Sequence, residues 1–415
     1  MYRTPKVFIV SQPFFPVPPV LDGAISHLIQ DTIDCLDTTN NSMKVISTWD
    51  KQMNSLSFNK GNFYFVYRKS PFLRIIKKIF IRKINPRLAY EIKNTSYLDM
   101  LYTLFVYSIL DRPQMLVVHT TRCEWVINIR KVFPKNTIKV VWYHHMSEDH
   151  VADDAHLKNF SLVDAHIFVS NHAREKFVAH VRRFDKLIEK KSYVIPNGIN
   201  TEIFAFNAQT RRETRQTLGV SDGTTLILYA GRLIPRKGLH KLLDAYSLLP
   251  KDIRDKTVLY LAGAEDYYRS NQSDYIFDLK EKAKDIGARI IFGGYIPRKV
   301  ITGLYCSADF FVLPSIEEEG MPVSIIEAQS VGLPVIASNM GGIPEIIINN
   351  ETGFIYEHDA EPAKLAEYMK LLIEDPLLRS QFGQKAKNNT MMNFPRERMA
   401  KDFSRIVSKV LYDSQ

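Results

Sequence analysis

Short apolar runs alternate with longer amphipathic stretches along most of this chain. Runs such as Lys6–Ser11, Ile138–His144 and Thr225–Ala230 have the length and the continuous apolar character of strands buried on both faces. Stretches of helical length, such as Asn171–His180 and Gly238–Leu248, lie between runs of this kind. Because strands alternate with helices, the pattern predicts an α/β fold built on doubly wound parallel sheets.

The length of the chain indicates more than one domain. Its 415 residues exceed what a single ordinary hydrophobic core organises. The strand–helix pattern begins again at the predicted strand Thr225–Ala230, which indicates a second domain. No stretch of eighteen or more apolar residues occurs in the sequence, so we expect no membrane-spanning helix.

The amino terminus and the cysteines favour a cytoplasmic protein. The apolar run near the amino terminus is short, is broken by Pro13 and lacks a small-residue cleavage site, unlike a secretory signal peptide. The 3 cysteines are odd in number and widely spaced, which argues against a disulfide framework and against a zinc site. We therefore expect a reducing compartment.

The positive charge of the chain is concentrated in one segment. The formal net charge is +10, and between Lys60 and Lys93 ten Lys or Arg residues face the single acid Glu91, a local excess of +9. Within it, the stretch Arg74–Lys83 interleaves Phe and Ile with cations, as in a helix that lies in a membrane interface. The cations of this candidate membrane contact are Arg74, Lys77, Lys78, Arg82 and Lys83. Two alternatives are a nucleic-acid contact, for which no recognised binding module is present, and a core helix whose basic side chains extend to solvent.

Three carboxylates follow one of the predicted strands and lead into an apolar helix. The strand is Asp309–Pro314, and the stretch SIEEEGMPVSIIEAQS covers residues 315–330. Gly320 permits a tight turn, and Pro322 suits the first helical position. Glu327 lies within the apolar helix, where a charge is costly to bury unless a ligand or a neighbouring Lys or Arg pairs with it. Because ligands of such sheets bind at the carboxyl ends of the strands, this stretch is a candidate site.

A basic turn after the predicted strand Thr225–Ala230 is the second candidate site. Arg232 and Lys237 flank the turn GRLIPRKG, which leads into the helix that begins at Gly238. A pyrophosphate at a helix N-terminus gains from the helix dipole and from unpaired N–H groups, and two cations can clamp it. The alternative is a basic turn that is only solvated.

Two residues of the first domain also follow predicted strands. Gly23 opens a helix after the first strand, with Asp22 as a plausible N-cap. His145 lies just past the strand Ile138–His144, and the adjacent His144 makes the assignment ambiguous by one residue. A histidine in this place can instead be bonded to a backbone carbonyl group.

The chain resembles the retaining glycosyltransferases of family four. The resemblance rests on Glu319 and Glu327, which are separated by seven residues as in the signature of that family, and on the segment VIPNGINTEIF at 194–204. It implies the GT-B fold, in which two Rossmann-like domains face each other across a cleft. The implied parts are an acceptor-side domain of residues 1–197, a nucleotide-sugar-binding domain of residues 198–395, and a last helix, 396–415, that crosses back onto the first domain.

The same resemblance implies roles for individual residues. Glu319 would lie by the donor sugar, and Glu327 would hold the ribose of the nucleotide. Arg232 and Lys237 would stabilise the diphosphate, and His145 would lie near the donor sugar and the acceptor. The other expected donor contacts are Gly23, Gly294, Tyr295, Ile296, Gly320, Met321, Pro322 and Val323. Because two cations serve the diphosphate, we expect neither a metal ion nor a cofactor.

The function that these observations predict is glycosyl transfer. We expect a hexosyl or N-acetylhexosaminyl group to move, with retention, from a nucleoside diphosphate sugar such as a UDP sugar to a hydroxyl of a lipid-linked saccharide or cell-surface polymer. The protein would then be peripheral on the inner face of the cell membrane and would bind no nucleic acid. Two alternatives are an enzyme that glycosylates protein serines and a catalytically silent partner subunit that binds a sugar.

Overall fold

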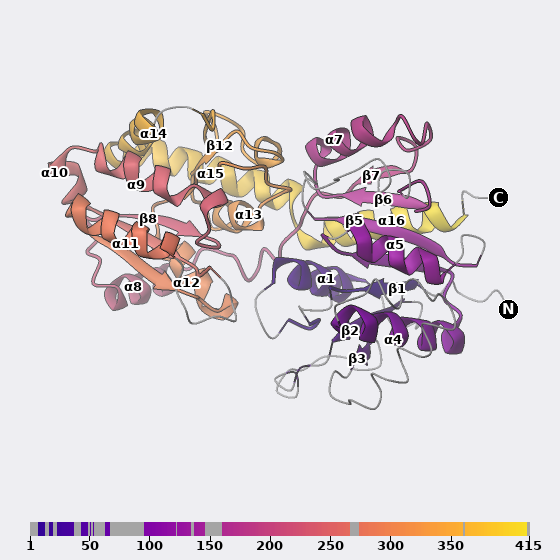
Figure 1. Cartoon of the computed structure of the whole chain (residues 1–415). Coiled ribbons are helices and arrows are strands. Elements are labelled where there is room, and N and C mark those ends of the chain that lie inside the picture. The colour runs from indigo at the N-terminus through magenta and orange to yellow at the C-terminus, as the bar shows by residue number, and fades with distance from the viewer. Residues whose placement is uncertain are drawn as a thin grey trace. The chain divides into compact units, whose positions relative to one another are not determined.

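The chain divides into two compact units. A computed structural model of the chain describes residues 7–12, 16–19, 23–36, 43–48, 50, 53, 63–66, 95–121, 123–133, 137–145, 160–265, 274–359 and 362–412. The first unit comprises Met1–Pro196 with Met399–Gln415, and the second comprises Asn197–Arg398 (Figure 1). The candidate membrane contact and its five cations, Arg74 to Lys83, lie outside the described residues, as does Asp22.

The first unit is built on a parallel sheet whose described strands follow the order β3-β2-β1-β4-β5-β6-β7. The strands are β1 Val7–Val10, β2 Met43–Thr48, β3 Phe63–Val66, β4 Met115–His119, β5 Lys139–His144, β6 Ala165–Phe168 and β7 Ser192–Val194. The order reverses between β1 and β4, and a ligand of such a sheet binds at the carboxyl ends of the strands beside this reversal.

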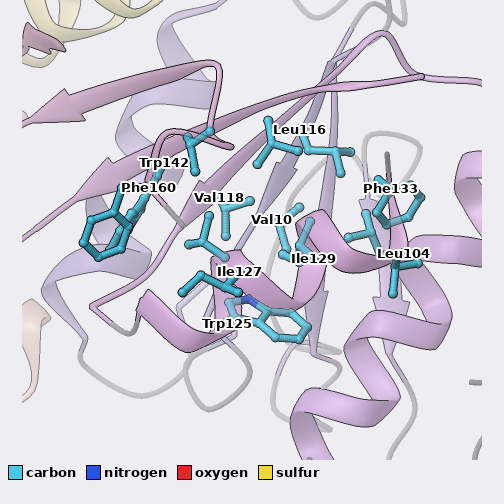
Figure 2. Close-up of a cluster of buried hydrophobic side chains, with 14 of the residues drawn as sticks. Val10, Leu104, Leu116, Val118, Trp125, Ile127, Ile129, Phe133, Trp142 and Phe160 are labelled. Atoms are coloured by element: carbon cyan, nitrogen blue, oxygen red, sulfur yellow. The ribbon is translucent and has the colours of Figure 1, made fainter. Parts of the chain in front are cut away.

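Helices cover the sheet of the first unit and form its core with the strands. The described helices are α1 Ala24–Cys35, α4 Thr95–Asp111, α5 Cys123–Val132, α7 Asn171–Val181 and most of α16 Arg396–Tyr412. Figure 2 shows Trp125 and Ile129 of α5 among the side chains that pack with Leu116 and Val118 of β4. All residues of β4 are buried, which explains why this strand is apolar throughout.

Helix α4 was not predicted from the sequence. Its apolar residues Met100, Leu101 and Leu104 are fully buried, but Ile109 and Leu110 near its end are exposed. Apolar residues therefore occur on both the buried and the exposed side of the helix. This distribution removes the period of 3.6 residues by which an amphipathic helix is recognised.

The second unit contains a parallel sheet in the order β10-β9-β8-β11-β12-β13. The strands are β8 Thr225–Ala230, β9 Thr257–Ala262, β10 Ile290–Gly294, β11 Phe310–Leu313, β12 Val335–Ser338 and β13 Gly353–Tyr356. The helices are α8 Ala208–Thr217, α9 Leu239–Ser247, α10 Lys251–Arg254, α11 Asp274–Ile286, α12 Arg298–Ser307, α13 Val323–Ser330, α14 Pro362–Glu374 and α15 Pro376–Asn393, with 3₁₀ turns η3 Pro235–Lys237 and η4 Ile343–Glu345. Helix α9 contacts α11 and α14, whereas α8 packs on α12 and α13 on α15. The prediction of two Rossmann-like α/β domains is confirmed.

The central strands of the second unit are fixed by a partly buried carboxylate. Asp309, just before β11, accepts ion pairs from Arg211 at 2.7 Å and Arg215 at 3.2 Å. The same carboxylate accepts a hydrogen bond of 2.7 Å from the backbone N–H of Leu226 in β8. These contacts hold the starts of β8 and β11 side by side, so the loops that follow the two strands emerge next to each other.

Candidate active site

The reversal of strand order in the second unit lies between β8 and β11, and both candidate stretches follow these strands. The backbone N–H of Ile316 donates to the carbonyl of Arg236 at 3.0 Å and so joins the two loops. Gly238 has φ +68°, and a Cβ atom added there would lie 2.0 Å from the carbonyl oxygen of Pro314. Only glycine combines this conformation with so close an approach, which brings the basic turn onto the end of β11.

Lys237 and Glu319, one from each loop, form a buried ion pair at this point. The Lys237 Nζ lies 2.6 Å from the Glu319 Oε1, and the two side chains are 12% and 8% exposed. The hydroxyl of Ser315 donates to the same Oε1 at 2.7 Å. Among the described residues no donor reaches the other oxygen, Oε2. One carboxylate oxygen is thus fixed by the protein, and the second can accept a hydrogen bond from a ligand.

The surroundings of Glu319 keep its carboxylate ionised. Burial opposes ionisation, but the charges of Lys237 and Arg236 and the hydrogen bonds from Lys237 and Ser315 outweigh it and lower the pKa of Glu319. Burial lowers the pKa of Lys237, and the adjacent carboxylate opposes that shift. The pair therefore combines an anion that orients hydroxyl groups with a cation that attracts phosphate.

Two glycines support Glu319 from the loop that follows β12. Gly341 has φ +62°, and a Cβ atom there would lie 2.2 Å from the backbone oxygen of Glu319. The N–H of Gly342 donates to that same oxygen at 2.8 Å. The loop after β12 therefore packs directly on the backbone of Glu319 and fixes its position.

Arg232 projects from the same loop as Lys237. Its carbonyl group accepts a hydrogen bond of 2.7 Å from the hydroxyl of the buried Tyr229, which anchors the backbone at this point. Its side chain is exposed and forms no ion pair with any residue that the structure describes. A guanidinium group in this state is available to a phosphate.

Glu327 is paired within the protein. The sequence left open whether a ligand or a neighbouring Lys or Arg pairs with this residue, and the structure shows an arginine. Its Oε1 lies 3.2 Å from Arg298, and its Oε2 accepts a hydrogen bond of 2.9 Å from the hydroxyl of Tyr305. Arg298, the first residue of α12, also lies over the ring of Phe204 with 5.0 Å to the centroid. Both carboxylate oxygens of Glu327 therefore have partners within the second unit.

The other residues predicted to contact the donor lie in two loops of the second unit. Gly294 ends β10 with φ +65° and accepts a backbone hydrogen bond of 2.8 Å from Gly263, and Tyr295 after it is 41% exposed. The sequence Gly320–Val323 leads into α13, and Pro322 is its N-cap rather than its first residue. Met321 is buried, and its carbonyl accepts from the amide of Asn197 at 2.8 Å, which is a structural contact. Ile296 is partly buried.

The structure distinguishes the two adjacent histidines of the first unit. His144 is buried at the end of β5, where its Nε2 lies 3.0 Å from the Nδ1 of His166. His145 follows the strand, and its Nε2 lies 3.0 Å from the Nδ1 of His119. His119 ends β4, beside the reversal of strand order, and was not predicted as a site residue. Gly23 is the N-cap of α1 in an extended conformation.

Burial keeps these histidines neutral. It lowers the pKa of His145 and of His166 to about 3, and it lowers the pKa of His119 and His144 well below the ordinary value. The contact between His119 and His145 is therefore a hydrogen bond between two neutral rings. One ring donates and the other accepts, so the contact couples the tautomer of His145 to that of His119.

The part of the chain that the structure describes shows neither a metal cluster nor a membrane-spanning helix. There, no cluster of three or more His, Cys, Asp or Glu residues is arranged to hold a metal ion. None of the helices found there is long and apolar enough to cross a membrane.

Comparison with known proteins gives the same picture. Residues 210–389 match the family described as Glycosyl transferases group 1. The chain is 25% identical over 407 residues to the lipopolysaccharide 1,2-N-acetylglucosaminetransferase of Salmonella typhimurium, covering 96% of this chain and 97% of that protein. It is 35% identical over 148 residues to the O-antigen chain mannosyltransferase B of Escherichia coli, covering 36% of this chain and 37% of that protein.

Solved structures share the fold over nearly the whole chain. Anabaena Alr3699/HepE in complex with UDP has a TM-score of 0.75 at 17% identity, over 97% of this chain and 100% of that chain. WaaG, a glycosyltransferase involved in lipopolysaccharide biosynthesis, has a TM-score of 0.66 at 14% identity, over 96% and 99% of the two chains. The chain is therefore similar to group 1 glycosyltransferases over residues 210–389, and it has the two Rossmann-like units of the GT-B fold.

Proposed function

We propose that this protein is a retaining glycosyltransferase. It moves a hexosyl or N-acetylhexosaminyl group from a UDP sugar to a hydroxyl of a lipid-linked saccharide or cell-surface polymer. The observation that carries the proposal is the buried Lys237–Glu319 pair, with its 2.6 Å contact, at the reversal of strand order in the second unit. A cation and an oriented carboxylate at this point suit the diphosphate and the sugar of one donor molecule.

The leaving diphosphate is assigned to the basic loop. Negative charge builds up on it as the bond to the sugar breaks, and Lys237 and Arg232 stabilise that charge. The exposed guanidinium of Arg232 has no carboxylate partner among the described residues, so it binds phosphate without first breaking an ion pair. Structures of the similar protein Alr3699/HepE contain UDP and UDP-glucose, which supports UDP as the nucleotide.

Glu319 is assigned to orienting the sugar. Its Oε1 is held by Lys237 and Ser315, and its Oε2 accepts a hydrogen bond from a sugar hydroxyl. A carboxylate engaged in this way is a poor nucleophile, so we favour attack of the acceptor hydroxyl on the same face that the diphosphate leaves. The new bond joins the acceptor oxygen to the anomeric carbon, the leaving phosphate oxygen takes the bonding electron pair, and it also takes the acceptor's proton.

The remaining predicted residues complete the donor site. Glu327 and the loop at Gly294–Ile296 bind the nucleoside, with Tyr295 exposed beside the backbone groups that read the base. His145 serves the sugar and the acceptor, and its neutral state suits hydrogen bonding rather than charge stabilisation. Because Arg232 and Lys237 neutralise the diphosphate, we propose that transfer needs no metal ion.

The acceptor is proposed from the relatives and from the charge of the chain. The Salmonella relative is named for transfer to lipopolysaccharide and the Escherichia coli relative for the O-antigen chain. The basic segment Arg74–Lys83 would hold the enzyme at the inner face of the cell membrane, where a lipid-linked acceptor lies. A protein at this surface has its soluble donor on one side and its acceptor in the membrane.

The test is a screen of nucleotide sugars for thermal stabilisation, followed by turnover with the donor that stabilises most. A ligand at 100 times its dissociation constant stabilises by about 2.7 kcal/mol, which a melting curve resolves. The anomeric configuration of the product, read by NMR, then distinguishes retention from inversion. Stabilisation by no nucleoside diphosphate, or a product with inverted configuration, contradicts the proposal.

A further inference from the structure

A pocket of about 290 Å³ lies in the first unit between β7, α7 and α16. Strand β7 is the edge strand of its sheet, and α7 and the part of α16 that lines the pocket belong to the same unit (Figure 1). None of the residues assigned to glycosyl transfer lines this pocket. Its volume is at the lower end of the range for small-molecule sites.

All the charged residues that line the pocket are cations. Three cations, Arg174, Arg405 and Lys409, line the pocket, and no carboxylate is among the lining residues. Arg405 and Lys409 are four residues apart on α16, so their side chains lie on one face of the helix. Like charges in this spacing are unfavourable unless an anion offsets them. Asp402 pairs with Arg405 at 3.1 Å on the same helix, which offsets one of the three charges.

Arg174 is held in place by backbone groups and presents its remaining donors. Its Nε donates to the carbonyl of Ser192 at 3.0 Å and its Nη2 to the carbonyl of Glu189 at 3.3 Å. These two bonds tie α7 to the backbone around the edge strand β7. They use only two of the five N–H groups of the guanidinium. Within the described residues the other N–H groups of Arg174 have no acceptor.

Lys409 is also without a carboxylate partner in the part of the chain that the structure describes. Its ammonium lies 5.4 Å from the centroid of the Tyr193 ring, a cation–π contact that places the charge at the pocket wall. The first residue of α7, Asn171, also lines the pocket, and the N-terminal end of a helix favours an anion.

We propose that this pocket binds a phosphate group that is carried by a saccharide or by a lipid headgroup. A guanidinium fork matches the oxygens of a phosphate, and a lysine adds a point charge. The pocket would hold a charged part of the acceptor or of the membrane that contains it. The site is distinct from the donor site, because no residue of the Lys237–Glu319 region takes part in it.

The experiment compares phosphate binding by the full chain and by three variants. The probes are glucose 6-phosphate, measured by calorimetry at constant ionic strength, and phosphatidylcholine vesicles with and without phosphatidic acid, measured by co-sedimentation. Arg174→Gln/Lys409→Gln removes two cations of the pocket. Lys401→Gln removes an exposed cation of the same helix α16 that does not line the pocket, and it serves as the matched control. Lys237→Ala tests the donor site.

The proposal expects saturable binding of at least one probe that falls tenfold or more in the double variant. Binding by Lys401→Gln stays at the wild-type level, and the double variant loses more binding than Lys237→Ala does. Loss for glucose 6-phosphate identifies a saccharide phosphate, and loss for phosphatidic acid vesicles identifies a headgroup. If the double variant folds poorly, Lys409→Gln replaces it, because the side chain of Lys409 is exposed. Probe binding by Lys409→Gln should also fall below the wild-type level. Binding of neither probe, equal loss in Lys401→Gln, or loss only in Lys237→Ala overturns the proposal.

Discussion

Replacing Lys237 and Glu319 singly and together separates the structural role of the pair from its role in transfer. Both side chains are buried, at 12% and 8% exposure, and their charged atoms lie 2.6 Å apart. Removing one member of such a pair leaves an uncompensated charge and costs about 3 kcal/mol of stability. We expect Lys237→Met to lose that amount, because Ser315 and Arg236 remain near the carboxylate but do not replace the ammonium. We expect Lys237→Met/Glu319→Gln to recover most of it, because no unpaired charge remains.

The pH dependence of the single variant gives a second signature. The wild-type pKa of Glu319 is lowered, so ionisation of this group stabilises the fold at neutral pH, and that stability is lost as the pH falls through the folded pKa. In Lys237→Met the largest cause of the lowering is gone, and burial raises the pKa of Glu319. The destabilisation of Lys237→Met relative to the wild type should therefore shrink as the pH is lowered from 7 towards 5.

Activity should not follow stability in this series. The loss of one group that stabilises charge in the transition state costs on the order of 10²–10³ in rate. We expect kcat/KM to fall by this factor in Lys237→Met and to stay low in the double variant, although its stability recovers. The assays are urea unfolding for stability and UDP release for transfer. Recovery of activity in the double variant, or single variants that lose neither stability nor turnover, would refute the reasoning.

Further predictions address the glycine, the ribose carboxylate and the neutral histidines. Gly238→Ala should destabilise by at least about 1 kcal/mol more than Gly287→Ala in urea unfolding, because both have positive φ but only Gly238 has a backbone oxygen at 2.0 Å from the added Cβ. Equal losses of stability in the two variants would show that the basic turn does not lie closely against the end of β11. Glu327→Ala should weaken UDP binding by roughly 1–3 kcal/mol in calorimetry, and an unchanged affinity would leave this residue only its contacts within the protein. The pKa of His166 is about 3 in the folded chain, so the chain should lose stability as the pH falls below 6.5, by about 2 kcal/mol at pH 5 for this group. His166→Gln should show a smaller loss over the same pH range, and an identical loss would assign the acid sensitivity to other groups.

The sequence predicts the parts of the site that depend on strand order and loop chemistry. Lys237 and Glu319 each follow an apolar run, and parallel strands end at one edge of a sheet, so their proximity follows from the α/β pattern. The sequence places Gly238 at the start of a helix. It does not indicate the close approach of Gly238 to Pro314, which only glycine permits, because that approach depends on the pairing of β8 with β11.

The residues that were missed depend on contacts between strands and helices. His119 meets His145 only because β4 and β5 are adjacent and His119 lies opposite Tyr143 in the register. Tyr143 and His145 then share one side of the chain while His144 lies on the other, which sequence order alone leaves ambiguous. The pairing of Glu327 with Arg298 and Tyr305 likewise joins two helices whose packing no local pattern specifies.

The most direct test of the central claim is a crystal structure of the protein with UDP bound. We expect the diphosphate at the reversal of strand order in the second unit, within hydrogen-bond distance of Arg232 and Lys237, and the uridine towards Glu327 and the loop at Gly294. A nucleotide seated at any other place in the chain, with the Lys237–Glu319 pair away from it, would contradict the account.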